Sequence, residues 1–552
     1  MNTQLLISPR QSNTQAQIQK DVEFLQSCIK EKKYGQGIAK ARECLEREPH
    51  NLQFKKYLAF SLSMSGELYE AKSYWLELIE EDPYSEEYLL NLSQVEQNLG
   101  RLDSAIGLLQ LAAEYHPTSA KPWMSLGEGF SLKGDVQNSV NASLEAIKRN
   151  PKNPEAFQNL GSNFFSLAMF DEAEHAFQTA LILNPEIQEA KSSLSAILFR
   201  KNQPDAAAEL LDELISQHQS STRMSLAQIK WNAALIQLRL GNLHKGWEYY
   251  EEGLSAEVQG TKTRKPNRTF DVPRWTPQTP IGQTVLVWRE QGIGDDVIFM
   301  TCLQDLIDAG YKPLVECDAR MIDLIQRSFP TVKAREAIYR IEYPNDSPYN
   351  DFEFHLPMGS LMKYFRPNLD SFDNKAGAYL KVDVAKKAKW SNELEKIRNG
   401  KKLVGITWRG GLTDAVGQMK YSKLIDWAPL LSSEEFVFVN LQFGECEQEL
   451  QEVESALGIH IHRWSDLDLK NDLDDVCALI SCLDDVVTIS SAVWTFSAAL
   501  GARTSLLLSA PHWTMFNQEH IPFFSSVTCF CADNNSSMAS VLPRIKHHLL
   551  HP

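Results

Sequence analysis

The chain has 552 residues, which is enough for two or three domains with a sizeable core. Its formal net charge is −16, and this argues against nucleic acid as a main partner, because neutralising phosphates requires a basic face. The first 258 residues carry 34 Asp and Glu against 24 Lys and Arg, so this acidic half suits a neutral or basic polypeptide.

Nothing in the composition indicates secretion or insertion into a membrane. The first twenty residues are polar, and no uninterrupted apolar run is long enough to span a bilayer. The nine cysteines are scattered, odd in number and without a CxxC pair, which is typical of a reducing compartment and provides no metal framework. We therefore expect a cytoplasmic protein without a metal site.

Three series of residues recur at a step of 34 in the N-terminal part of the chain. They are Pro49, Pro83, Pro117, Pro151 and Pro185; Gly66, Gly100, Gly134 and Ala168; and Ala71, Ala105, Ser139, Ala173 and Ala207. Apolar residues recur between them at helical spacing, as in Trp123, Leu126 and Phe130. A 34-residue helix–turn–helix period with small residues where helices cross is the tetratricopeptide pattern.

The repeats cover roughly residues 18–219, about six units, after a segment 1–17 that we expect to be flexible. One unit cannot bury its apolar face, so the units are expected to stack into an all-α superhelix with a concave, polypeptide-binding groove. Residues 220–258 are expected to form helices that cap the solenoid, and the proline-rich segment 259–280 to form a linker. Its basic side chains are expected in solvent, with contact to an anion as the alternative: Lys262, Arg264, Lys265 and Arg268.

From Ile281 onward, short β-branched runs alternate with amphipathic helices. This alternation predicts parallel α/β sheets with ligand sites at the carboxyl ends of the strands. Two Rossmann-like lobes, 281–399 and 400–552, fit best, with a less regular region near Asn345–Asn374. The expected strands are Val285–Trp288, Pro313–Glu316, Leu403–Trp408, Phe436–Leu441, Ile459–Trp464, Val486–Ile489 and Ser505–Leu508.

Two glycines and two aspartates follow the first of these strands, in the run REQGIGDD. A dinucleotide site needs G-x-G-x-x-G, but Val297 stands at the third glycine position. Asp295 and Asp296 would also repel a pyrophosphate at the start of the helix. We expect one aspartate to cap the helix and the other to supply a carboxylate for chemistry, while the glycines let the backbone approach a sugar.

Two further motifs favour an anionic ligand. The run ITWRGG ends a strand with Arg409, which can pair bidentately with a diphosphate, and Lys420 adds a second positive charge. A surface arginine in a tight turn is the alternative. In DDVVTISSAVW, Ser490 and Ser491 can cap the following helix, and hydroxyls with unpaired N–H groups at a helix start can bind an anion.

At this point residues 281–552 resemble a GT-B glycosyltransferase domain of the heptosyltransferase-like kind, glycosyltransferase family nine, found fused to tetratricopeptide repeats in bacteria. The runs that carry this resemblance are WREQGIGDDVIFMTCL, FHLPMGSL, GITWRGG, FVNLQFGE and DDVCALISCLDDVVTISSAVWTFSAALG. It implies Asp295 as the catalytic base. It also implies a set of residues around the acceptor and the sugar, namely Gln291, Gly292, Gly294 and Asp296.

The same resemblance implies a donor-binding set on the second lobe. This set is Arg409, Gly410, Gly411, Lys420, Gln442, Ser490, Ser491, Ala492 and Thr495. The family's Asp-Thr-x-x-x-His signature falls on Ser490, Ser491 and Thr495, so its acid and its histidine are both replaced. The replacement favours a donor sugar other than heptose.

The implied activity is inverting, metal-independent transfer of a sugar from a nucleotide sugar to Ser or Thr hydroxyls of a protein held by the repeats. The nucleotide sugar is a co-substrate, and no cofactor is implied. Similar repeat-fused enzymes include flagellin glycosyltransferases, so flagellin is a candidate acceptor. A non-catalytic scaffold with a degenerate transferase domain is the alternative, and an oxidoreductase is disfavoured by the missing third glycine.

Overall fold

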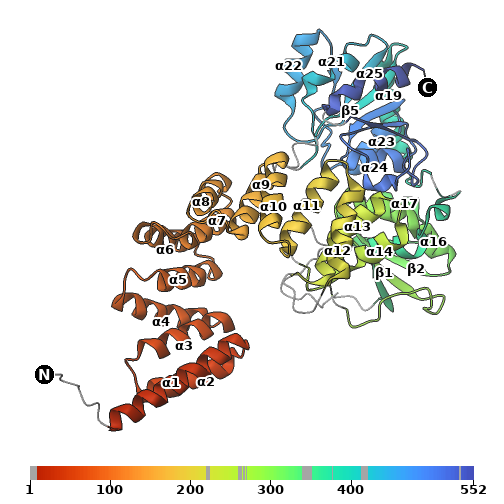
Figure 1. Ribbon diagram of the computed structural model, residues 1–552. Helices are drawn as coiled ribbons and strands as arrows, with labels where there is room; N and C mark the ends of the chain where they lie inside the picture. Colours follow the sequence, from red (N-terminus) through yellow and green to blue (C-terminus); the bar gives the residue numbers. More distant parts are fainter. Residues whose placement is uncertain are drawn as a thin grey trace. The chain divides into compact units, whose positions relative to one another are not determined.

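A computed structural model describes residues 9–218, 224–258, 264, 268, 270–337, 351–373, 375, 377–411, 421–533 and 536–551. The chain divides into two compact units, Met1–Ala190 and Lys191–Pro552. Figure 1 shows successive helices in the first unit, and helices together with strands in the second. Among the described helices, none is both long and apolar enough to cross a membrane.

The first unit is a succession of helices of similar length, as the 34-residue period predicts. Helix α1 begins within the segment that we expected to be flexible. The helices are α1 (Pro9–Lys30), α2 (Tyr34–Arg47), α3 (Leu52–Ser65), α4 (Leu68–Glu81), α5 (Glu86–Asn98), α6 (Leu102–Tyr115), α7 (Lys121–Lys133), α8 (Val136–Arg149), α9 (Pro154–Ser166) and α10 (Phe170–Leu183). Helix α11 (Gln188–Arg200) spans the boundary between the units.

The recurring residues act where the period requires them. Each proline of the series follows the end of a helix, for example Pro49 after α2 and Pro117 after α6, because proline cannot continue the helical hydrogen bonds. Small residues at the helix crossings let the backbones approach closely. These residues are fully buried: Ala71, Ala105, Ser139, Ala173 and Ala207.

The turns inside the helix pairs share one backbone conformation. One residue in the turn after the first helix of each pair has a positive φ, between 56° and 90°. These residues recur at a strict step of 34: Lys32, Gly66, Gly100, Gly134, Ala168 and Asn202. Glycine adopts this left-handed conformation without a steric penalty, whereas an alanine Cβ is crowded there. The fifth turn of the series is therefore strained at Ala168.

We expect Ala168→Gly to raise the free energy of unfolding of the first unit by about 1 kcal/mol, because glycine relieves the left-handed strain. The reverse change at the equivalent position, Gly134→Ala, should lower it by a similar amount, since Gly134 has a φ of 81° and open space around its Cα. Chemical denaturation of both variants measures the pair. Equal stability of the two variants would contradict the strain at residue 168.

The second unit holds two parallel sheets. The four-stranded sheet has the order β3-β2-β1-β4 and the six-stranded sheet the order β10-β9-β8-β5-β6-β7. All pairings between these strands are parallel. The strands are β1 (Thr284–Trp288), β2 (Lys312–Cys317), β3 (Lys333–Glu336), β4 (Phe354–Pro357), β5 (Lys402–Thr407), β6 (Phe436–Asn440), β7 (Ile461–His462), β8 (Asp485–Ile489), β9 (Thr504–Leu508) and β10 (Val527–Cys531).

Three of these strands, β3, β4 and β10, were not predicted. Strand β4 lies inside the segment that we described as less regular, where its four residues FHLP are too short to show an alternating pattern. Pairing with β1 makes it a strand, from Val285–Phe354 to Trp288–Pro357. Its position extends the first sheet on the side of β1 opposite β2.

Besides the two sheets, the second unit contains helices (Figure 1). They are α12 (Pro204–Ser216), α13 (Leu226–Arg239), α14 (Leu243–Glu251), α15 (Ile293–Phe299), α16 (Leu303–Asp308), α17 (Ile322–Ser328), α18 (Leu361–Phe365), α19 (Val384–Arg398), α21 (Ala428–Leu431), α22 (Glu447–Leu457), α23 (Leu473–Ile480), α24 (Ala492–Ala499) and α25 (Leu542–Leu550). The buried face of α15 joins the core that covers the first sheet.

Helices α13 and α14 were expected to cap the repeats, and α13 does pack on α12, with Ala233 and Leu211 in one apolar cluster. The two helices also belong to the core of the first sheet. Leu238 and Trp247 lie in one apolar cluster with Val287 of β1. The Trp247 indole N–H also donates a hydrogen bond of 2.9 Å to the carbonyl oxygen of Arg366. Large aromatic side chains thus attach this hairpin to the α/β part, where they bury more apolar surface than at a free solenoid end.

The segment 259–280 does not leave its arginines in solvent. Arg264 is 1% exposed and ion-paired with Glu290 and Glu251, and Arg268 is ion-paired with the buried carboxylate of Glu316. The expectation of solvated side chains was wrong for both arginines, because local composition carries no information about buried acids elsewhere in the chain. Lys262 and Lys265 lie outside the described residues.

Candidate functional site

The run REQGIGDD forms the turn between β1 and α15. Helix α15 begins at Ile293, and its N-cap residue is Gly292. The helix therefore starts earlier than we expected, and Gly294 lies in its first turn. Neither aspartate is the N-cap, which corrects the predicted capping role. Asp295 is the third residue of the helix, and its carboxylate accepts a hydrogen bond from the backbone N–H of Gly292, as the acid of a capping box does.

The carboxyl group of Asp295 is half-buried and electrostatically perturbed. Burial raises its pKa to about 6, the Gly292 N–H opposes this rise, and the nearby charge of Glu290 adds to it. A carboxylate with a pKa near neutrality is ionised at neutral pH and still basic enough to accept a proton. Among the predicted residues in this turn, Asp295 combines partial exposure with a pKa near neutrality.

Asp296 has a different environment from its neighbour. It is fully buried, and one carboxylate oxygen lies 3.0 Å from Nε of Arg289. Burial raises its pKa well above the ordinary value, although Arg289 opposes this shift. The predicted contact of Asp296 with an acceptor or sugar is therefore not available in this structure, because the carboxyl group does not reach the surface.

The start of α15 lies against the start of α24 from the other sheet. A Cβ on Gly294 would stand 3.5 Å from the Cα of Ala492 and 3.5 Å from Oγ1 of Thr495. Thr495 is buried, and its hydroxyl donates to the carbonyl oxygen of Ala492. The structure therefore brings the predicted acceptor motif and the predicted donor motif together, and it places Thr495 in their packing rather than at a surface.

Ser491 caps α24, as the sequence predicted. Its hydroxyl oxygen accepts a hydrogen bond of 3.3 Å from the backbone N–H of Val493. Ser490 precedes it at the end of β8, and Ser490, Ser491 and Ala492 are all half-buried. This arrangement leaves the serine turn at the carboxyl end of β8, where ligands of parallel sheets are bound.

The turn after β5 is held together by Gln442. Its side-chain oxygen accepts hydrogen bonds from the Thr407 hydroxyl and from the backbone N–H groups of Trp408 and Arg409, at 2.9 to 3.1 Å. Because Gln442 is 1% exposed, it shapes this turn rather than offering its amide to a ligand. Gln442, which was predicted to contact the donor, therefore has a structural role in this turn.

The side chain of Arg409 is engaged within the protein. Its guanidinium group pairs with Glu449 of α22 at 3.1 Å and donates to the Glu445 carbonyl oxygen. Beside it, Gly410 lies against the Tyr421 ring and Gly411 is exposed. Lys420 lies outside the described residues.

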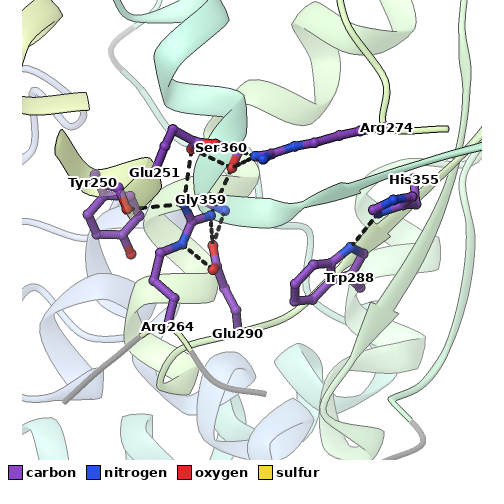
Figure 2. Close-up of polar contacts among 9 residues, drawn as sticks. All are labelled: Tyr250, Glu251, Arg264, Arg274, Trp288, Glu290, His355, Gly359 and Ser360. Carbon is purple, nitrogen blue, oxygen red and sulfur yellow. Dashed lines mark hydrogen bonds and ion pairs between the residues drawn. The ribbon is translucent and has the colours of Figure 1, made fainter. Parts of the chain in front are cut away.

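Two residues next to Asp295 were missed by the sequence reasoning. Glu290 adjoins Gln291 at the end of β1, and Tyr250 of α14 places its hydroxyl in a hydrogen bond with the Gln291 side chain. Figure 2 shows Tyr250 and Glu290 around the buried guanidinium of Arg264. Glu290 had a sequence signal, an acid two residues after a strand, whereas Tyr250 had none because it lies in a distant helix.

Within the described ranges, no group of three or more His, Cys, Asp and Glu side chains is arranged to hold a metal ion. Asp466 and Asp468 stand in a short run, DLD, and both are exposed in a loop after β7. Asp468 accepts hydrogen bonds from the backbone N–H groups of Lys470 and Asn471, which is a local turn.

Comparison with known proteins agrees with the helical part of this architecture. A family model described as tetratricopeptide repeat matches residues 159–222. The chain contains tetratricopeptide repeats. Protein FlbA of Caulobacter vibrioides is 28% identical over 468 residues, which cover 82% of this chain and 71% of FlbA. A match of that length extends beyond the repeats into the part that holds the two sheets.

Two solved structures are similar to part of the chain. The crystal structure of MamA shares 22% identity and a TM-score of 0.27, covering 29% of this chain and 93% of MamA. A tetratricopeptide repeat protein from Parabacteroides merdae is 12% identical, with a TM-score of 0.36. The match covers 42% of this chain and 91% of that protein's chain.

Proposed function

We propose that this protein is a GT-B glycosyltransferase that moves a sugar from a nucleotide sugar to Ser or Thr hydroxyls of a protein. In this proposal the four-stranded and six-stranded sheets are the cores of the acceptor lobe and the donor lobe. The observation that carries it is Asp295, a half-buried carboxylate with a pKa of about 6 at the carboxyl end of β1. Its helix contacts the start of α24, which is the predicted anion-binding end of the other sheet.

The proposed reaction needs a base and a site for the leaving group. Asp295 takes the proton of the acceptor hydroxyl while the oxygen attacks the anomeric carbon, and the bond from that carbon to the diphosphate breaks with inversion. Backbone N–H groups at the start of α24 and the guanidinium of Arg409 stabilise the departing diphosphate, with Lys420 as a third contributor, in place of a divalent metal. When the donor binds, a phosphate group replaces the carboxylate of Glu449 as the partner of the Arg409 guanidinium.

The tetratricopeptide repeats support a protein acceptor, because such repeats generally bind polypeptides along their surface. The resemblance to repeat-fused enzymes makes flagellin the first acceptor to test. Mass spectrometry of surface proteins from a strain without this gene would identify both the acceptor and the sugar, since the modified peptide would lose the mass of that sugar.

A non-catalytic scaffold is the second candidate. Two observations favour it: Thr495, which replaces the family histidine, is buried, and Arg409 already has a carboxylate partner. A scaffold of this kind would keep the fold of the second unit but bind no nucleotide sugar. The two candidates therefore differ in a direct binding measurement.

We expect calorimetry with a panel of nucleotide sugars to detect binding to at least one of them. Arg409→Gln should weaken that binding by about 10-fold to 100-fold, because it removes a charge-assisted contact to phosphate. Glu449→Gln should have the opposite effect and tighten nucleotide-sugar binding, because it removes the carboxylate that pairs with Arg409. The amide oxygen of the new glutamine can still accept the hydrogen bond from the Trp408 indole N–H. Absence of heat with every nucleotide sugar would favour the scaffold.

A further inference from the structure

Arg264 is the centre of a buried ionic cluster in the second unit (Figure 2). Its guanidinium makes a bidentate ion pair with Glu290, with 2.6 Å between Nη2 and Oε1. It also donates to Glu251 at 2.9 Å and to the Ser360 hydroxyl at 2.8 Å. Both members of the central pair, Arg264 and Glu290, have side chains with no exposed area.

The carboxylate of Glu290 is held on more than one side. Besides Arg264, it accepts a hydrogen bond of 2.8 Å from the backbone N–H of Gly359. A Cβ at Gly359 would lie only 2.6 Å from Oε1 of Glu290 and 3.0 Å from the Tyr250 ring, so no side chain fits between them. The end of β1 is therefore fixed tightly against residues 359–360.

Helix α14 joins this cluster to the turn that carries Asp295. The Arg264 guanidinium lies 4.5 Å from the centroid of the Tyr250 ring, and the Tyr250 hydroxyl is hydrogen-bonded to Gln291. Glu251, the next residue of α14, also pairs with Arg274. Arg264 thus contacts both neighbours of the turn, Glu290 on the strand side and Tyr250 on the helix side.

We propose that Arg264 is a positioning residue for Asp295: it neutralises Glu290 and, with Tyr250, holds the Gln291–Asp295 turn in the orientation needed for proton transfer. The inference rests on the proposed function. Without the guanidinium, a second carboxylate charge next to Asp295 would be uncompensated, and like charges favour the protonated acid. The base would then ionise only at higher pH.

The charged and titratable groups around Asp295 are few among the described residues. Glu290 faces it from the end of β1, Tyr250 from α14 and Asp296 from its own helix. The contacts from α24 are Ala492 and Thr495, which carry no charge. Changing Arg264 therefore acts on Asp295 mainly through Glu290.

Arg264→Gln tests the proposal, because glutamine removes the positive charge while its amide can still donate a hydrogen bond to Glu290. We expect kcat at about neutral pH to fall roughly 10-fold or more, the midpoint of its pH profile to rise by about one unit, and donor affinity to change less than about twofold. Transfer at higher pH should recover most of the loss. A loss of kcat that is equal at all pH values would overturn the positioning role.

Arg274→Gln is the matched control. Among the described contacts, Arg274 reaches Glu251 and Ser360 in the same cluster but not Glu290, so the pH midpoint should not move. Hydrogen exchange provides a readout that does not need activity. The amides of residues 291–296 should exchange about 10-fold faster in Arg264→Gln and at an unchanged rate in Arg274→Gln. Unchanged exchange in both variants would overturn the inference even if no transfer is detected, whereas faster exchange without transfer would refute only the proposed function.

Discussion

Replacing Asp295 by Asn is expected to abolish sugar transfer and to stabilise the second unit above about pH 6. Removing a general base reduces kcat by roughly 10²-fold to 10⁴-fold. The stability gain follows from the pKa of about 6, which is above the ordinary value of 3.8 for an aspartate. An acid whose pKa is raised on folding binds its proton more tightly in the folded protein, so the folded protein loses stability as pH rises through this window.

Asparagine keeps the shape of the side chain and an oxygen that can accept the Gly292 N–H, but it never ionises. The penalty of the buried charge is therefore absent in the variant at every pH. We expect a gain of about 1 to 2 kcal/mol at about pH 8, less than the full shift implies because Asp295 is only half-buried. At about pH 4 the gain should nearly vanish, since the wild-type acid is then protonated in the folded state.

Thermal unfolding and transfer rates, measured together between about pH 4.5 and pH 8, test this pair of effects. If the wild-type kcat rises with pH with an apparent pKa near 6, the same ionisation would control both the transfer rate and the stability. Normal turnover by Asp295→Asn would remove the proposed base. A stability difference that does not depend on pH would show that the carboxylate is solvated.

The second large effect is expected at the Arg264–Glu290 pair. Arg264→Met should lower the free energy of unfolding of the second unit by about 3 to 5 kcal/mol, because it leaves a fully buried carboxylate without its cation. Adding Glu290→Gln should restore more than half of that loss, since the uncompensated charge is gone and the amide oxygen still accepts the Gly359 N–H.

Chemical denaturation of the two single variants and the double variant measures this coupling. Arg274→Gln is the control, because Arg274 is more exposed and its loss should cost no more than about 1 kcal/mol. Additive losses in the double variant would contradict the strong coupling that the buried geometry implies. The cycle depends only on the fold and holds whether or not the protein is a transferase.

Features that depend on neighbours in the sequence could be predicted well. The 34-residue period predicted the helix pairs of the repeats and the prolines that follow them, because helix formation depends on contacts within a few residues. The strands with several consecutive β-branched or apolar residues, such as β5 and β8, were found for the same reason. Ser491 was identified as an N-cap, since the capping hydrogen bond reaches only two residues ahead.

Features that depend on contacts with distant parts of the chain could not be predicted from the sequence. The short strand β4 exists because β1 provides its hydrogen bonds, and the burial of Thr495 exists because Gly294 lies against its helix. The aspartate expected to cap α15 was assigned to the wrong position, since the helix starts at Ile293, earlier than the sequence pattern indicated. For β4 and for Thr495, the deciding contact joins residues far apart in the chain.

The sequence by itself determined that this chain combines tetratricopeptide repeats with parallel α/β structure, and that Asp295 follows the first strand. Only the tertiary structure decided that Asp295 is the half-buried acid while Asp296 is sealed in the core, and that Arg264 is buried against Glu290 rather than solvated. The physical reason is range: helix and strand formation depend on local contacts, whereas the burial and ionisation of a side chain depend on every segment that folds around it.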